Sequence, residues 1–191
     1  MATEAIRAVE GEGNERRFII SFSSEEPYNR WFGPEILDHK DGAVDLERLN
    51  NIGVLLFNHD TDKVMGKVIR AWLENSRGQA EVEFDTDEDA ETIFQKVKSG
   101  TLKGVSVRYA VSIWEEVMAG EKSSDGRFSG PCSIATSWTP LEVSIVSVPA
   151  DATVGVGRDM GEDEATPAPS NSGRMTLRAA QRQLQINKNY L

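Results

Sequence analysis

The sequence is poor in cysteine and has no long apolar run, and each scarcity excludes a class of protein. Cys132 is the single cysteine among 191 residues, which excludes an internal disulfide and a multi-cysteine metal site. No apolar stretch approaches the roughly 20 residues that a membrane-spanning helix needs, so no membrane partner is expected. Arg7, Glu10 and Glu12 interrupt the N-terminal segment, so no secretory signal peptide is expected there.

Basic residues are scarce as well. The chain has 21 Lys and Arg against 31 Asp and Glu, which gives a formal net charge of −10. Proteins that bind nucleic acid replace phosphate counterions with Lys and Arg, so general nucleic-acid binding is not expected. With 39% hydrophobic and 27% charged residues, the composition is that of a soluble globular protein with one core and an appendage.

Composition divides the chain into four parts. Residues 1–15 are polar and predict a flexible N-terminus, whereas residues 16–156 carry the apolar patterns of one domain. Residues 157–174 are rich in Gly, Pro, Ser and acidic side chains, which predicts a disordered linker. Residues 175–191 form a basic tail with helical spacing, interpreted either as a segment that docks on an acidic partner or as a frayed end.

Hydrophobic periodicity predicts a mainly β domain of the α+β class. Strands are expected at residues 16–22, 54–57, 64–73, 79–85, 102–109 and 141–148, with helices at 45–49 and 86–99. A further strand at 133–138 is expected to break at Thr139 and Pro140, and residues 118–131 to form a mobile loop. Trp31 and Phe32 are expected to pack against the core, and His39 to be exposed in a polar turn.

The strand at residues 102–109 carries the first candidate for chemistry. Val105, Val107 and Tyr109 alternate with Ser106 and Arg108, so the two sets lie on opposite faces. Ser106 and Arg108 share a face about 7 Å apart, given roughly 3.3 Å per residue. This pair is either a nucleophile beside an anion-stabilising group or the ordinary polar side of a half-buried strand.

Two more candidates lie at or near strand ends. His59 follows the apolar strand at 54–57 and is either a reactive group or a turn histidine bonded to the backbone. Glu142 lies on the face of the 141–148 strand opposite Val143, as a solvated charge or an orienting group for a histidine.

A serine, a histidine and a carboxylate together meet the needs of serine hydrolysis. The hydroxyl needs a base to take its proton, and the base needs a group that holds the correct tautomer. The chain has no Gly-x-Ser-x-Gly elbow, no Gly-rich phosphate loop and no His/Cys cluster, so no cofactor or metal is expected. A metal-dependent hydrolase built on His59, Asp60 and Asp62 is an alternative.

Three blocks in this order resemble one family. LLFNHD with the downstream Gly66, KSGTLKGVSVRY, and PLEVSIVSVPAD resemble the HK97-type phage prohead (capsid maturation) serine proteases over about residues 16–156. That family is similar in fold to the herpesvirus assembly proteases (assemblin). The resemblance therefore implies a mostly antiparallel β-barrel with a few surrounding helices.

The resemblance also implies roles for single residues. Ser106 would be the nucleophile and His59 the general base that later protonates the leaving amine. Herpesvirus relatives use a second histidine as the third member, which this chain does not match because His39 lies upstream. Glu142 takes that place as the orienting acid, with Asp60 as the alternative, and either Arg108 or backbone N–H groups near 139–141 would serve the oxyanion.

The implied activity is cleavage during capsid assembly. Such proteases act in the procapsid interior, in the host cytoplasm. They cut the scaffolding segment of the major capsid protein or a separate scaffold, and often themselves. Residues 157–174 would be a self-cleavage region and the basic tail a packaging element; the resemblance also allows a homodimer. The rival hypothesis is a non-catalytic scaffold protein of the same fold.

Overall fold

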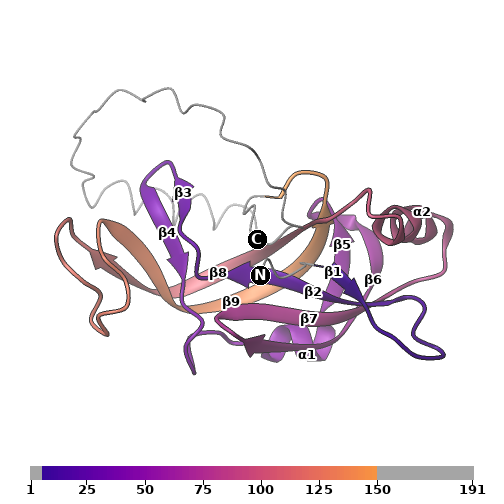
Figure 1. Cartoon of the computed structure of the whole chain (residues 1–191), viewed down its shortest axis with the longest axis horizontal. Coiled ribbons are helices and arrows are strands. Elements are labelled where there is room, and N and C mark those ends of the chain that lie inside the picture. Colours follow the sequence, from indigo (N-terminus) through magenta and orange to yellow (C-terminus); the bar gives the residue numbers. More distant parts are fainter. Residues whose placement is uncertain (1–5, 150–191) are drawn as a thin grey trace. The chain divides into compact units, whose positions relative to one another are not determined.

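The alternating apolar patterns form nine strands in the computed structural model, which describes residues 6–149 (Figure 1). The predicted linker at 157–174 and the tail at 175–191 lie outside these residues. The strands are β1 (Ile6–Ala8), β2 (Arg17–Ser24), β3 (Tyr28–Arg30), β4 (Gly33–Leu37), β5 (Val54–Phe57), β6 (Asp60–Glu74), β7 (Arg77–Phe84), β8 (Gly104–Val117) and β9 (Cys132–Val146). Two helices accompany them, α1 (Glu47–Ile52) and α2 (Glu88–Lys98). The mainly β, α+β class is therefore confirmed. β1 is a strand that the pattern did not predict, and it pairs with β2.

All nine strands belong to one curled sheet. Its order is β1-β2-β7-β6-β5-β9-β4-β3, and β8 pairs with β9 outside this path. Most neighbours are antiparallel, but β9 runs parallel to both β5 and β4. Figure 1 shows the curvature of the sheet. Within residues 6–149 no ladder joins β8 to β2, so the curled sheet has an open seam between these strands.

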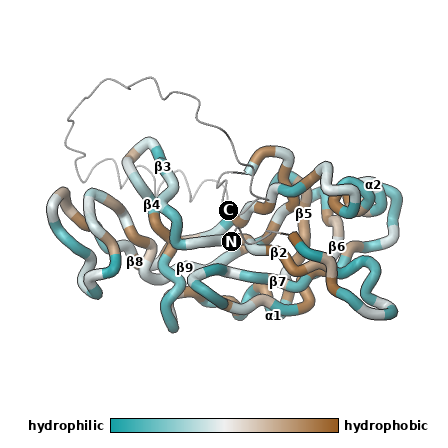
Figure 2. The backbone as a smooth tube through the Cα atoms, viewed as in Figure 1, coloured by the Kyte–Doolittle hydropathy of each residue, from teal (hydrophilic) through white to brown (hydrophobic). Residues whose placement is uncertain are grey.

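The core fills the inside of the curl. Ile20, Val82, Leu55, Val105 and Val143 come from five different strands and have no exposed surface. Figure 2 shows apolar residues gathered around β2 and β5. Because each buried aliphatic side chain contributes about 1.5–3 kcal/mol, this shared core fixes the strands that carry the candidate residues.

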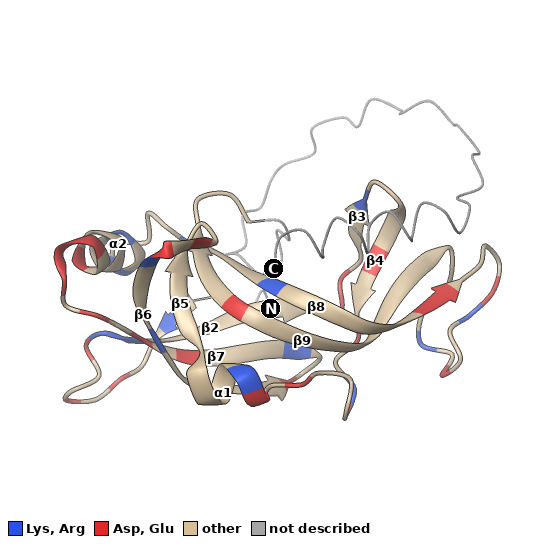
Figure 3. Cartoon of the chain, turned by 180° about the vertical axis from the view of Figure 1, so that it is seen from behind, with Lys and Arg blue, Asp and Glu red and all other residues tan. Residues whose placement is uncertain are grey.

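Helix α2 covers one end of the core and follows the predicted pattern. Asp87 caps it, since its carboxylate accepts a hydrogen bond from Ala90 N–H at 3.1 Å. Ala90, Ile93, Phe94 and Val97 form its buried stripe. Acidic residues occupy its first turn, where the helix dipole favours them, and Figure 3 shows them at the start of α2. No helix within residues 6–149 is long and apolar enough to cross a membrane.

Strand β9 contradicts the predicted break at Thr139 and Pro140. It runs without interruption from Cys132 to Val146 and pairs with β8 along its whole length. Arg108 lies opposite Glu142, but the next residue, Tyr109, lies opposite Pro140. Leu141 is therefore the extra residue of a β-bulge, which accommodates a proline that cannot donate to the ladder.

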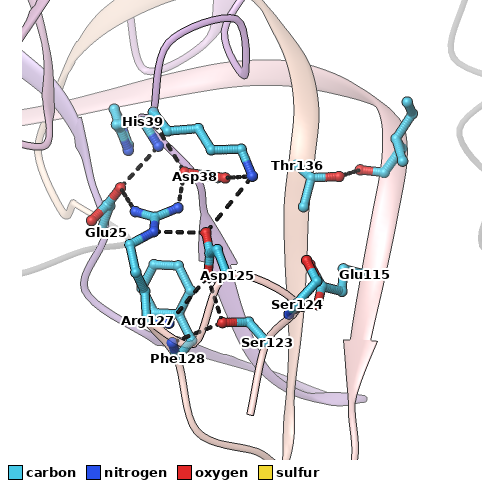
Figure 4. Close-up of polar contacts among 12 residues, drawn as sticks. Glu25, Asp38, His39, Glu115, Ser123, Ser124, Asp125, Arg127, Phe128 and Thr136 are labelled. Atoms are coloured by element: carbon cyan, nitrogen blue, oxygen red, sulfur yellow. Dashed lines mark hydrogen bonds and ion pairs between the residues drawn. The ribbon is translucent and has the colours of Figure 1, made fainter.

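The connection between β8 and β9 also differs from the expected mobile loop. Arg127 lies at its centre and contacts three carboxylates, as Figure 4 shows. Its guanidinium lies 2.5 Å from Asp38, 2.9 Å from Glu25 and 2.8 Å from Asp125. These ion pairs tie the connection to the segments that follow β2 and β4.

Two aromatic residues do not pack as predicted. Trp31 lies in the turn between β3 and β4 with 66% of its surface exposed. Its ring meets Phe32 edge-on at 5.5 Å, and Phe32 in turn lies 6.5 Å from Trp114 of β8. A two-residue hairpin turn projects away from the sheet, so these rings pack on one another instead of on the core.

Candidate active site

His59 lies in the two-residue turn between β5 and β6. Phe57 pairs with Asp60, and Asn58 and His59 between them adopt left-handed φ angles of 54° and 60°. Two consecutive positive φ values match the turn that the twist of a β-hairpin favours, and asparagine and histidine tolerate them better than most residues. A hydrogen bond links this turn to the end of β9, because Asn58 Oδ1 accepts from Ser147 N–H at 3.0 Å.

The side chain of His59 contacts Glu142. His59 Nδ1 lies 2.6 Å from Glu142 Oε1. A carboxylate only accepts, so Nδ1 carries the hydrogen and Nε2 of the neutral ring is left as the basic nitrogen. Glu142 is only 6% exposed, which strengthens this charge-assisted bond relative to one at the surface.

Ser144 links the carboxylate to the backbone of the histidine. Its hydroxyl donates to Glu142 Oε2 at 2.7 Å and accepts from His59 N–H at 3.1 Å. Ser144 is completely buried, so it cannot contact a substrate. It was not predicted as part of the site. The available signal was its position two residues after Glu142, on the same face of the strand.

Ser106 is placed on the neighbouring strand. It lies on β8 directly opposite Ser144, half-buried. Ser106 and His59 line one open groove of about 650 Å³, together with Tyr28, Asn58 and residues 146–149. No hydrogen bond joins Ser106 Oγ to His59 in the described part of the chain. Such bonds are often long in an enzyme without substrate.

Arg108 lies two residues further along β8, opposite Glu142. Its Nη2 donates to the carbonyl oxygen of His59 at 2.9 Å, and its Nε lies 4.0 Å from Glu142 Oε1. The guanidinium therefore stabilises the turn that contains His59. Its role towards an oxyanion stays a prediction. The backbone near 139–141 lies opposite Tyr109 and Ala110 rather than Ser106.

The other predicted residues lie elsewhere. Asp60 Oδ1 accepts from Asp62 N–H at 3.0 Å, whereas Glu142 is the carboxylate on His59. Among residues 6–149, no three His, Cys, Asp or Glu side chains are grouped to hold a metal.

His39 is buried, so its predicted exposure is wrong. It packs edge-on against Trp138 with ring centroids 5.5 Å apart. Its Nδ1 donates to Leu37 O at 2.8 Å, and its Nε2 accepts from the buried Ser23 hydroxyl at 2.7 Å. Burial lowers the pKa of His39 below its usual value.

Two comparisons with known proteins found similarity to this chain. A family described as caudovirus prohead serine protease matches residues 19–164. A protein named "Major capsid protein" from Halomonas phage phiHAP-1 is 37% identical over 151 residues, which are 77% of this chain. Those residues are 24% of that protein, so the chain spans about a quarter of its length. No solved structure matches the chain.

Proposed function

The chain belongs to the caudovirus prohead serine protease family, and from this premise we propose that it is a serine endopeptidase of prohead maturation. Ser106, His59 and Glu142 are its catalytic residues. The observation that carries the proposal is the 2.6 Å contact between His59 Nδ1 and the buried Glu142, in a turn whose histidine shares a groove with Ser106.

The mechanism follows from these three groups. Ser106 Oγ attacks the scissile carbonyl carbon while His59 Nε2 takes its proton. The protonated imidazole then delivers that proton to the leaving amine, which leaves an acyl-enzyme on Ser106. A water molecule, deprotonated by His59, hydrolyses the ester and restores the serine. Glu142 accepts the hydrogen bond from His59 Nδ1 and stabilises the imidazolium.

The proposed substrate is the scaffolding segment of the major capsid protein, inside the assembling procapsid. The 37% identical relative carries the printed name "Major capsid protein", which supports an association of this domain with capsid assembly.

Self-cleavage within 157–174 is proposed as well. Intact mass that stays full-length during long incubation of active protein would refute that part.

Intact-mass spectrometry after co-expression with the cognate capsid protein tests the activity. Wild type, Ser106→Ala and the control Ser112→Ala are compared, since Ser112 is an exposed serine of the same strand. Capsid fragments in the wild type and the control alone are expected. Uncut protein in all three, with shells still assembling, would favour the non-catalytic scaffold. Cleavage by Ser106→Ala would show that the nucleophile is another residue.

A further inference from the structure

A second hollow lies beside Ser106, in the open seam of the sheet. This cavity has a volume of about 60 Å³. Phe22, Ser23 and Ser24 of β2 line one side, and Ser106, Val107 and Tyr109 of β8 line another. Ser106 also lines the groove that contains His59. Ser106 therefore belongs to the lining of both the cavity and the groove.

The cavity is lined mainly by apolar groups. Phe22 and Leu37 contribute side chains from β2 and β4, and Val107 and the Tyr109 ring contribute from β8. Water gains few hydrogen bonds against such a lining and is readily displaced by an apolar group.

Two charged residues of the lining, Arg30 and Glu35, form an ion pair that the Tyr109 hydroxyl joins. Tyr109 O–H donates to Glu35 Oε1, and Arg30 Nη2 lies 2.8 Å from Tyr109 Oη and 3.3 Å from Glu35 Oε1. Burial raises the pKa of Tyr109 above its usual value, and the Glu35 carboxylate adds to this effect. The phenol is therefore neutral at pH 7, and the charges of Arg30 and Glu35 cancel.

A full charge entering the cavity would upset the balance of the ion pair between Arg30 and Glu35. Glu26, also in the lining, further disfavours a carboxylate.

The volume limits the size of the occupant. One water needs about 10–15 Å³ of such space, so the cavity has room for about four to six heavy atoms. Aliphatic and amide side chains of intermediate length fit this limit, whereas aromatic side chains exceed it.

We infer that this cavity is the pocket for one substrate side chain flanking the scissile bond, and that it selects uncharged side chains such as leucine, methionine or glutamine. This inference rests on the proposed function, because it assumes that Ser106 attacks a peptide bond beside the cavity.

The test is the cleavage of a proteome-derived peptide library by the full chain, with products sequenced by mass spectrometry. At one position flanking the cut, Met and Gln should exceed Lys and Glu, which are of similar length, by about tenfold, the discrimination typical of a pocket contact. Val107→Ala enlarges the cavity and should admit Phe at that position, and Val107→Phe should shift the preference to Gly and Ala. Val111→Ala is the control, since Val111 is a half-buried valine of β8 outside the cavity lining.

The possible results distinguish failure of the pocket inference from failure of the proposed protease function. A preference for Lys or Glu overturns the inference while leaving the protease intact. The inference is also overturned if cleavage depends on Ser106 but the preferred side chain beside the cut is the same in wild type, both Val107 variants and the control. Absence of cleavage by wild type, or cleavage by Ser106→Ala, refutes the proposed function and the inference with it.

Discussion

Replacing Glu142 with glutamine should reduce turnover about a thousandfold without unfolding the protein. Glu142 Oε1 lies 2.6 Å from His59 Nδ1, and the carboxylate is 6% exposed. With charge centres about 4 Å apart and an effective dielectric constant of about 20, the carboxylate stabilises the imidazolium by about 4 kcal/mol. Each 1.36 kcal/mol corresponds to about a tenfold change in rate, which gives the expected factor.

The assay is single-turnover cleavage of the capsid protein, with urea unfolding measured on the same samples. Glutamine has nearly the same shape as glutamate, so the free energy of unfolding should change far less than the rate. Glu116→Gln is the matched control, because Glu116 also lies on the β8–β9 pair and accepts a bond from Ser133 at 2.8 Å. A rate within about threefold of wild type, well below one 1.36 kcal/mol step, would refute the orienting role of Glu142.

Four further tests concern Ser144, the buried His39, the ion pairs of Arg127 and the absence of a metal from the proposed mechanism. Ser144→Ala should lower kcat up to about thirtyfold with KM unchanged, since two hydrogen bonds of about 1 kcal/mol each hold the histidine turn. A changed low-field Nδ1–H resonance of His59 checks this, and an unchanged spectrum and rate would contradict it. Folding lowers the pKa of His39, so its contribution to the free energy of unfolding is complete above about pH 6.5 and is lost as pH falls below that value. His39→Gln should therefore reduce the slope of the unfolding free energy against pH, measured in urea, by up to about 1.4 kcal/mol per pH unit. Equal slopes in the variant and the wild type would contradict this. Arg127→Met should cost about 2 kcal/mol of unfolding free energy, because Asp38, 1% exposed, loses its 2.5 Å partner, whereas exposed Arg7→Met should cost little. Chelation should leave cleavage unchanged, since none of the three proposed catalytic groups requires a metal. Lost activity would restore the alternative based on His59, Asp60 and Asp62.

Local pattern predicted the elements well where one periodicity dominates. The predicted helix over 86–99 is observed as α2, and the predicted strands over 54–57 and 79–85 as β5 and β7. The errors occur where a long-range contact overrides a local signal. Pro140 suggests a break, yet pairing with β8 carries β9 through it by a bulge. Polar neighbours suggest exposure for His39, yet Ser23 and Trp138 enclose it.

The alternation of apolar and polar residues was enough to indicate the mainly β class and which side chains share a face of each strand. The sequence also contained the three residue types that serine hydrolysis needs, at positions 59, 106 and 142. Which of these residues lie together depends on how the strands pair. The parallel pairing of β5 with β9 sets the His59 turn against Glu142 and Ser144, and the antiparallel pairing of β8 with β9 sets Ser106 opposite Ser144. Alternation along one strand carries no information about the register between strands, because register depends on hydrogen bonds and packing between residues far apart in the chain.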